Sequence, residues 1–243
     1  MPATGAHECV SLIIPAHNEA DRIAETLQVV RQMDAFTRVL VVDDGSVDDT
    51  AVIVRKAALE DPWVSLISLP TNQGKAAAMV AGAEAASTDL VVFIDADLVG
   101  LKPQHLHDLT LPVVDNECDM TLGLFRGGRL QTDLSHFLTP FLSGQRCLRW
   151  SLFRDTPYLD KARGGIEVGL SLHARRKHLR VQHVPWVGVT HVMKTEKMGR
   201  ARGLWVHFMM YGEILRYVAQ VAFDPILHTR PARPHLAEDP KRD

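Results

Sequence analysis

The 243-residue sequence predicts an α/β fold with a Rossmann-like, mostly parallel central sheet flanked by helices. Two observations support this fold class. In the first half of the chain, short β-branched runs alternate with segments of helical spacing, which is the pattern of right-handed βαβ units. Polar and glycine-containing segments follow the apolar runs, and in a parallel sheet such segments gather at the ligand-binding edge. The second half is less regular, and we expect a mixed arrangement there.

Five short apolar runs in the first half are predicted to be strands. The fourth contains Val-Val-Phe-Ile, and four successive apolar residues indicate a strand that is buried on both faces, as in parallel sheets. The five runs cover residues 10–14, 38–42, 64–69, 89–94 and 119–125. One further short strand is predicted at residues 179–184.

Helices are predicted between these strands. Ile23, Leu27 and Val30 share one helical face after the first strand. Ser46 and Asp49 have the spacing of an N-terminal capping box that opens the helix before the third strand. Further helical segments are predicted at residues 74–86, 103–114, 131–142, 147–153, 165–178 and 203–221.

The composition is that of an ordinary globular chain, with 46% hydrophobic and 23% charged residues. A formal net charge of −2 provides no general basic field, so we expect no nucleic-acid partner. The three cysteines are far apart and form no CxxC pair, which favours a reducing compartment. Neither a signal-peptide pattern nor an uncharged apolar run of about 18 residues is visible, so we expect a cytoplasmic location.

Asp95 and Asp97 form a DXD motif directly after the buried fourth run. Carboxylates at the end of such a strand are costly to desolvate unless a cation meets them. Paired carboxylates separated by a small residue suit a hard divalent ion, which prefers oxygen ligands and often shares them with substrate phosphates. The competing interpretation is a strand end with solvated, helix-capping aspartates.

A second acidic segment follows the second strand. Asp43 and Asp44 come directly after it, and Gly45 permits a tight turn. An aspartate at this place can accept hydrogen bonds from a ribose or from a base N–H group. The alternative is a purely structural turn, which is the interpretation we prefer for Asp48 and Asp49.

Two further charged residues lie at predicted strand ends. Glu19 follows the first strand, where it either contacts the same ligand or favours the first turn of its own helix. Lys75 stands at a predicted helix start, which is a favourable place for a phosphate group. The glycine fingerprints of dinucleotide-binding and Walker-type phosphate loops are absent from the sequence.

Four segments, taken in order, resemble the nucleotide-sugar domain of family 2 glycosyltransferases, which have the GT-A fold. They are VSLIIPAHNEADRI, VLVVDDGSVDDT, NQGKAAAM and VVFIDADL, between residues 10 and 98. The second half is similar to glucosyl-3-phosphoglycerate synthases and their bacterial relatives. The segments that carry this similarity are PFLSGQRCLR at 140–149, GGIEVGLSL at 164–172 and WVGVTHV at 186–192.

The resemblance implies one GT-A domain over residues 1–229, with a nucleotide-sugar half at 10–100 and an acceptor half at 101–229. The last segment, 230–243, is Pro-rich and charged, and we expect it to be a disordered tail.

The resemblance also implies a donor site for a nucleotide sugar. Asp44 would lie near the base, Glu19 near the ribose, Lys75 near the phosphate or ribose, and Asp95 near the ribose or sugar. The complete implied set is Pro15, Ala16, Glu19, Asp44, Lys75 and Asp95.

A metal site of Mg²⁺ or Mn²⁺ is implied beside the donor. Asp97 would bind the ion that bridges the two phosphates, and His191 would complete its protein ligands. Such an ion neutralises the charge that develops on the departing nucleoside diphosphate. Without the resemblance, His191 would be interpreted as a structural histidine.

The acceptor side is predicted from two loops. Gly144, Gln145 and Arg146 form a turn whose backbone N–H groups and guanidinium could receive an anionic acceptor. Arg126 lies beside two glycines after the fifth strand, in a loop that could close over a phosphate. Either loop could equally be an ordinary solvated turn.

Glu167 lies in an apolar setting and, with Asp97, is a predicted catalytic residue. It could act as a general base if the acceptor is an alcohol. The alternative is a glutamate that merely favours a helix N-terminus.

The apolar segment 203–223 has three interpretations: packing on the sheet, a homodimer interface, or contact with a membrane surface. We place packing or dimerisation first. Peripheral contact with the inner face of the membrane is the alternative to a purely cytoplasmic location.

We therefore expect a metal-dependent hexosyltransferase. Its donor would be UDP- or GDP-linked glucose or mannose, and its acceptor a small anion such as a phosphoglycerate-like compound. One alternative is a polyprenyl-phosphate hexosyltransferase at the membrane surface, and another is a non-catalytic nucleotide-sugar-binding protein. The sequence does not distinguish retention from inversion of configuration.

Overall fold

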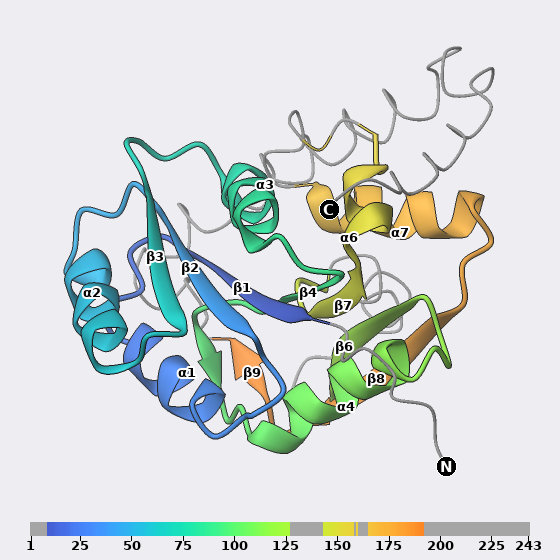
Figure 1. Ribbon diagram of the computed structural model, residues 1–243, viewed down its shortest axis with the longest axis horizontal. Coiled ribbons are helices and arrows are strands. Elements are labelled where there is room, and N and C mark those ends of the chain that lie inside the picture. The colour runs from blue at the N-terminus through green and yellow to red at the C-terminus, as the bar shows by residue number, and fades with distance from the viewer. Residues whose placement is uncertain (1–8, 127–142, 158, 160–164, 192–243) are drawn as a thin grey trace, which may run out of the picture.

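A seven-stranded sheet forms the centre of the computed structural model, with the strand order β3-β2-β1-β4-β7-β6-β8 (Figure 1). The structure describes residues 9–126, 143–157, 159 and 165–191, and at His191 it describes the backbone alone. The strands of this sheet are β1 (Val10–Ala16), β2 (Arg38–Asp44), β3 (Val64–Leu69), β4 (Leu90–Phe93), β6 (Met120–Arg126), β7 (Arg146–Arg149) and β8 (Val181–Val187). A small second sheet pairs β5 (Leu98–Val99) with β9 (Thr190–His191).

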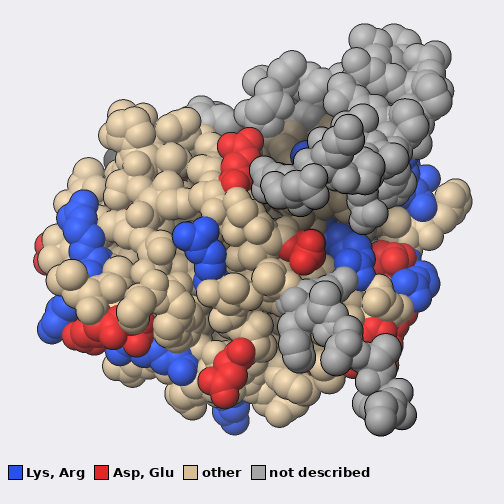
Figure 2. Space-filling model, in the orientation of Figure 1, with Lys and Arg blue, Asp and Glu red and all other residues tan. Residues whose placement is uncertain are grey.

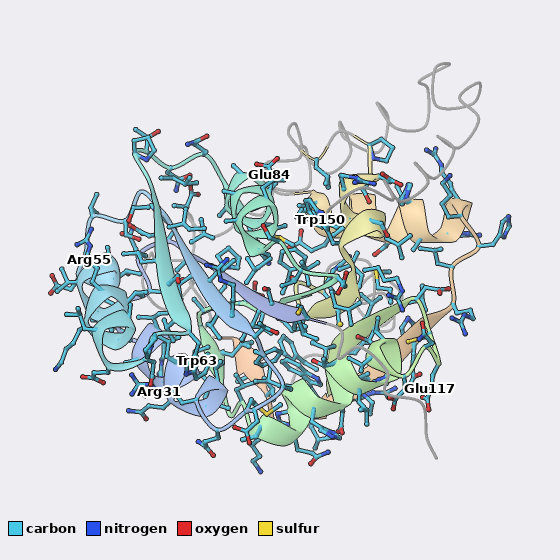
Figure 3. All side chains as sticks on the ribbon, in the orientation of Figure 1. Arg31, Arg55, Trp63, Glu84, Glu117 and Trp150 are labelled. Carbon is cyan, nitrogen blue, oxygen red and sulfur yellow. The ribbon has the colours of Figure 1, made fainter. Side chains whose placement is uncertain are left out.

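Helices cover both faces of the sheet (Figure 1). They are α1 (Ile23–Val30), α2 (Thr50–Glu60), α3 (Lys75–Ala86), α4 (Pro103–Val114), α6 (Trp150–Arg154) and α7 (Ile166–Arg176). The α/β class and the strands and helices predicted for the first half are therefore confirmed, with shifts of a few residues at their ends. On the outer side of α2, Arg55 points away from the sheet (Figure 3).

Alternating side chains of the buried strands build two apolar cores, one on each face of the sheet. Leu12 and Ile14 of β1 join the core under α1, α2 and α4. Ile13, between them, joins the core under α3, α6 and α7. Because successive strand residues point to opposite faces, a strand covered on both sides must be apolar at every position.

The order in which strands are added to the sheet reverses at β1. The chain first builds outward from β1 through β2 to β3, all parallel, and β4 then adds in parallel to the other side of β1. At such a switch point the chain leaves two neighbouring strands, here β1 and β4, toward opposite sides of the sheet. A crevice therefore opens between the carboxyl ends of β1 and β4.

Strand β7 corrects the prediction of a helix at 147–153. Arg146–Arg149 forms a strand that runs antiparallel to both β4 and β6, and only Trp150–Arg154 is helical. Cys147 joins one core and Leu148 the other, so the strand is apolar on both faces at its centre. So short a run does not distinguish strand from helix by its spacing.

Trp150 marks the point where β7 turns into α6 (Figure 3). Its backbone N–H donates to the carbonyl of Asp89 at 2.8 Å. Its ring stacks on Phe153 at 5.8 Å between centroids, and Phe153 in turn contacts Phe93 of β4 at 5.0 Å. These contacts attach the second half of the chain to the first.

The capping box predicted from Ser46 and Asp49 is wrong. The hydroxyl of Ser46 accepts a hydrogen bond from the backbone of Asn18, and α2 begins at Thr50 without a side-chain cap from Asp49. Asp48 instead accepts bonds from the backbone and hydroxyl of Thr50, which confirms its structural role. Burial alone would raise the pKa of Asp48, but these hydrogen bonds outweigh it and hold that pKa below its usual value.

The later elements agree in part with their predictions. Helix α7 confirms the segment predicted at 165–178, and β8 begins and ends a few residues later than the strand predicted at 179–184. The predicted helices at 131–142 and 203–221 and the tail at 230–243 lie outside the described residues. Among the helices that the structure does describe, none has the length and apolar character needed to cross a bilayer.

Charges of both signs are interspersed over α1 and α2 on the face shown in Figure 2. Arg31 of α1 pairs with Glu60 of α2 at 3.1 Å and also meets Asp61. These half-exposed pairs tie the two helices together but contribute little stability each.

Candidate active site

A cleft of about 340 Å³ opens at the switch point between β1 and β4. It gathers every residue predicted for the nucleotide sugar, together with Asp97 of the DXD motif. Its lining consists of Pro15, Ala16, His17, Glu19, Asp44, Asn72, Gly74, Lys75, Ala78, Asp95, Ala96 and Asp97. The strand ends therefore converge as the sequence predicted, because parallel strands present their carboxyl ends at one edge.

Lys75 is the first residue of α3 and bridges two carboxylates in this region. Its Nζ lies 2.6 Å from Oδ1 of Asp95 and 2.7 Å from Oε1 of Glu167. Burial by itself would lower the pKa of Lys75, but the two negative charges raise it above its ordinary value. The bridge joins the end of β4 to α7, two elements that are far apart in sequence.

Asp44 holds the loop that leads into α3. Its two carboxylate oxygens accept backbone hydrogen bonds from Gln73 at 2.7 Å and Gly74 at 2.8 Å, and the residue is only 3% exposed. The sequence analysis placed Asp44 beside a base. In the structure its carboxylate positions the segment that carries Lys75, and a contact with a nucleoside remains a prediction.

The first strand end is tied to the second by side-chain contacts. Nδ1 of His17 donates a hydrogen bond to the backbone carbonyl of Asp44 at 2.8 Å. The backbone N–H of Glu19 donates to the hydroxyl of Thr50 at 2.9 Å. These bonds fix the loop after β1 against the loop after β2, and so shape one wall of the cleft.

Gln145 lies beside Asp95 of the cleft lining. Its Nε2 donates to Oδ2 of Asp95 at 2.9 Å, and its Oε1 accepts from the backbone N–H of Asp95 at 3.1 Å. The side chain is fully buried. In the structure the Gln145 side chain therefore contacts Asp95, and the acceptor contact predicted for it stays a prediction.

Arg146 also differs from its predicted role. It has no exposed surface, and its guanidinium donates to the carbonyls of Glu167, at 3.3 Å, and of Ser143. Burial lowers the pKa of Arg146 to about 10, although Glu167 and Asp95 oppose the shift. A side chain so enclosed supports the 143–146 turn from within and does not present itself to an acceptor.

Two other predicted residues lie apart from the lining of the cleft. Arg126 is exposed at the end of β6. Strands β4 and β6 both run antiparallel to β7 and therefore point in the same direction, so Arg126 lies on the same edge of the sheet as the cleft. The backbone of His191 pairs with Leu98, the residue after Asp97. The chain thus brings positions 97 and 191 to neighbouring places, while the side chain of His191 is outside the description.

Within the described residues, no group of three or more His, Cys, Asp or Glu side chains is arranged to hold a metal ion. Asp97 nevertheless lines the cleft next to Asp95. Sequence reasoning missed His17 and Asn72, which line the cleft as well. Their positions just after predicted strands were the available signal.

The family model described as Glycosyl transferase family 2 matches residues 11–174. This range contains all of the cleft residues and most of α7.

Two curated relatives are each similar to a little over one third of this chain. The undecaprenyl-phosphate 4-deoxy-4-formamido-L-arabinose transferase of Pseudomonas fluorescens is 38% identical over 96 residues, which cover 37% of this chain and 28% of the relative. A dolichyl-phosphate beta-glucosyltransferase of Trichomonas vaginalis is 36% identical over 96 residues, covering 36% of this chain and 28% of the relative. The similarity therefore spans little more than a quarter of either relative.

Solved structures with the same fold include glucosyl-3-phosphoglycerate synthase from Mycobacterium tuberculosis. Its complex with Mn²⁺, UDP-glucose and glycerol 3-phosphate has a TM-score of 0.70 at 23% identity, covering 88% of this chain and 79% of that chain. Its complex with Mn²⁺, UDP and glucosyl-3-phosphoglycerate has a TM-score of 0.69 at 24% identity, with coverage of 88% and 79%. At this level of identity the likeness shows the fold, and it confirms the GT-A architecture.

Proposed function

Because the chain belongs to glycosyl transferase family 2, we propose that it is a metal-dependent hexosyltransferase that uses a nucleotide-sugar donor and an anionic acceptor. The observation that carries this proposal is the cleft at the switch point. It places a cation, Lys75, and the carboxylates of Asp95 and Asp97 in one cavity at the carboxyl ends of β1 and β4. A sugar diphosphate needs both cationic and hydrogen-bond-accepting partners, and this cavity offers both.

The donor is proposed to lie with its nucleoside along the loops after β1 and β2. Pro15, Ala16 and Glu19 line that part of the cleft. Asp44 lines it too, and its carboxylate accepts hydrogen bonds from the backbone of the loop before α3. The diphosphate would then approach Lys75 and the N-terminus of α3, where the helix dipole favours negative charge. Asp95 would accept hydrogen bonds from hydroxyl groups of the ribose or sugar.

Asp97 and His191 are the proposed protein ligands of Mg²⁺ or Mn²⁺. A carboxylate oxygen suits either ion, and the strand pairing brings the two positions together. The resemblance to family 2 glycosyltransferases supports Asp97 as the metal ligand, and Asp97 lines the cleft beside Asp95. When bound, the ion would neutralise charge on the departing diphosphate, and substrate oxygens and water would complete its coordination.

Glu167 is proposed to meet the acceptor. It is largely buried, and the bridge through Lys75 aims its carboxylate toward the donor carboxylate Asp95. A carboxylate at this place can accept the proton of an attacking acceptor hydroxyl. Gly144 lies against the same bridge, so an acceptor that enters beside this turn would meet both groups.

Two acceptor classes have support from different relatives. A small phosphorylated acceptor is suggested by the structural neighbours, which were solved with phosphoglyceric acid or glycerol 3-phosphate. A polyprenyl phosphate is suggested by the curated relatives, whose names specify undecaprenyl and dolichyl phosphate. We place the small anion first because its neighbours align with most of this chain.

The first experiment measures donor binding. Thermal unfolding is recorded with UDP, GDP and their glucose and mannose conjugates, each with and without Mn²⁺. A ligand that binds only the native state at about 100 times its Kd adds ~2.7 kcal/mol to the free energy of unfolding. We expect one nucleotide to stabilise the protein in a metal-dependent manner, and stabilisation by none of them would contradict the proposal.

Asp97→Ala tests the metal site, and Asp34→Ala is a matched control, since Asp34 is exposed and precedes β2 at the opposite edge of the sheet. The variant at 97 should lose the metal-dependent part of the stabilisation, while the control keeps it. Release of nucleotide with 3-phosphoglycerate or with a polyprenyl phosphate then separates the acceptor classes. Binding without release in either assay would favour a non-catalytic nucleotide-sugar-binding protein.

A further inference from the structure

Gln145 and Asp95 form a closed pair of hydrogen bonds across fifty positions of sequence. The carboxamide accepts from the backbone N–H of Asp95 at 3.1 Å and donates to its Oδ2 at 2.9 Å. Only this orientation of the amide satisfies both contacts, because a carboxylate cannot donate and an N–H cannot accept. The pair lies just beyond the end of the β4–β7 ladder, in which Phe93 is opposite Arg146.

The two oxygens of Asp95 are thereby divided between two partners. Oδ1 faces the ammonium group of Lys75 at 2.6 Å, and Oδ2 faces Gln145. A carboxylate held at both oxygens cannot rotate about its own axis. Its plane, and hence the direction of its remaining lone pairs, is set by these two side chains together.

Gly144 makes this arrangement sterically possible. A Cβ atom at position 144 would lie 2.5 Å from Nζ of Lys75 and 2.9 Å from each oxygen of Asp95. The turn is also attached to β6, since the backbone N–H of Gly123 donates to the carbonyl of Gln145 at 2.9 Å. Gln145 is therefore held from its own backbone as well as through its side chain, and it has no exposed surface.

We propose that Gln145 is a positioning residue of the donor site, which holds Asp95 in the orientation that binds the hydroxyl groups of the nucleotide sugar. This inference rests on the proposed function. It also explains why a neutral amide occupies a fully buried place among charged groups. An amide donates to one carboxylate without adding a charge, whereas a carboxylate there would repel Asp95.

The experiment compares Gln145→Glu with Gln145→Met. A protonated carboxyl group reproduces both hydrogen bonds of the amide, whereas an ionised one loses its donor and faces Asp95 with like charge. The charged groups around it are Asp95 from the loop after β4, Lys75 of α3, Glu167 of α7 and Arg146 of β7. The like charge of Asp95 and burial both favour the protonated form, so we expect the new carboxyl group to titrate above the ordinary value of about 4.3.

UDP-glucose binding in the presence of Mn²⁺ is measured by calorimetry from pH 5 to 8, with each variant expressed as a ratio to the wild type at the same pH. Gln145→Glu should bind nearly as well as the wild type at pH 5 and about tenfold more weakly at pH 8. Gln145→Met should be weakened about tenfold at every pH. Melting temperatures at each pH establish that the variants are folded.

A ratio for Gln145→Glu that does not change with pH would overturn the inference, as would wild-type binding by Gln145→Met. A purely structural role would lower the melting temperature but leave the binding ratio unchanged. If the wild type itself binds none of the glucose and mannose conjugates of UDP and GDP, the proposed function is refuted, and the inference falls with it. Binding by the wild type with unaffected variants refutes the inference alone.

Discussion

Replacing Lys75 by methionine should destabilise the protein strongly at neutral pH and much less in mild acid. Methionine preserves the apolar stem of the side chain but removes the charge that lies 2.6 Å from Asp95 and 2.7 Å from Glu167. The side chains of these carboxylates are only 16% and 9% exposed. Without the cation, the poorly hydrated carboxylates of Asp95 and Glu167 remain close together and repel each other.

The size of the effect follows from this geometry. Removing one partner from a fully buried ion pair costs about 3–5 kcal/mol in the free energy of unfolding. The Lys75 side chain is 32% exposed, so solvent screens part of the interaction, and we expect a loss of about 2–3 kcal/mol at pH 7. Protonating one of the two carboxyl groups removes the repulsion, and the loss should fall below about 1 kcal/mol near pH 4.

The sign of the pH dependence differs between the two proteins. In the wild type the raised pKa of Lys75 means that its contribution is complete below the ordinary lysine value of about 10.4 and is lost only as the pH rises through the native value. Between pH 5 and 8 the bridge is therefore constant. In the variant the two carboxylates repel each other only while both are ionised, so the cost is present at neutral pH and disappears as the pH falls.

The measurement is urea unfolding of the wild type, Lys75→Met and Lys75→Arg at several pH values between 4 and 8. The arginine variant controls for the loss of lysine itself, because it retains a cation. A double variant, Lys75→Met with Glu167→Gln, should recover part of the loss at pH 7, since only one carboxylate remains. A loss that is independent of pH, or unaffected by the second substitution, would refute the reasoning.

Three other predictions concern parts of the fold that support the site. Asp44→Asn can no longer accept both backbone N–H groups of the loop before α3, so the free energy of unfolding should fall by about 1–3 kcal/mol and nucleotide binding should weaken, as urea titration and calorimetry would show. Hydrogen bonds from Arg180 lower the pKa of Asp119 in the native protein. Their stabilisation is therefore present above the ordinary aspartate pKa of about 3.9 and is lost as the pH falls through the native pKa. Arg180→Gln should unfold more easily than the wild type at about pH 7 and like the wild type near about pH 2. Gly82→Ala places a Cβ 2.5 Å from a methyl group of Ile13, and this overpacking of α3 on the sheet should cost about 1–3 kcal/mol, whereas an unchanged melting temperature would show that α3 adapts freely.

The first half of the fold was readable from local pattern. Its strands are buried on both faces and therefore nearly continuous in apolar residues, and the helices between them have regular spacing. The alternation also predicted that polar segments meet at one sheet edge, and the cleft confirms this. Strand β7 was missed because four residues, Arg146–Arg149, hold too short a pattern, and their neighbours in the sheet are distant in sequence.

Individual side chains of the site were harder to predict than its position. Asp44 was expected to face a ligand, but its carboxylate accepts two backbone N–H groups of a loop about thirty residues away. Arg146 was expected to meet an acceptor, but two carbonyl groups surround its guanidinium inside the protein. For Arg146 the surrounding structure selected a buried supporting role, whereas for Asp44 it added a supporting role and left the nucleoside contact a prediction.

The sequence by itself determined the α/β class, the family and the place of the cleft, because each of these depends on residues close together in the chain: hydrophobic periodicity, strand-end motifs and their order. The tertiary structure alone decided which charged and polar groups become partners. Lys75 meets Glu167, and Gln145 meets Asp95, across wide separations in sequence. Such pairs depend on the order of the strands in the sheet and on how the helices pack against it, and no local spacing in the sequence encodes either.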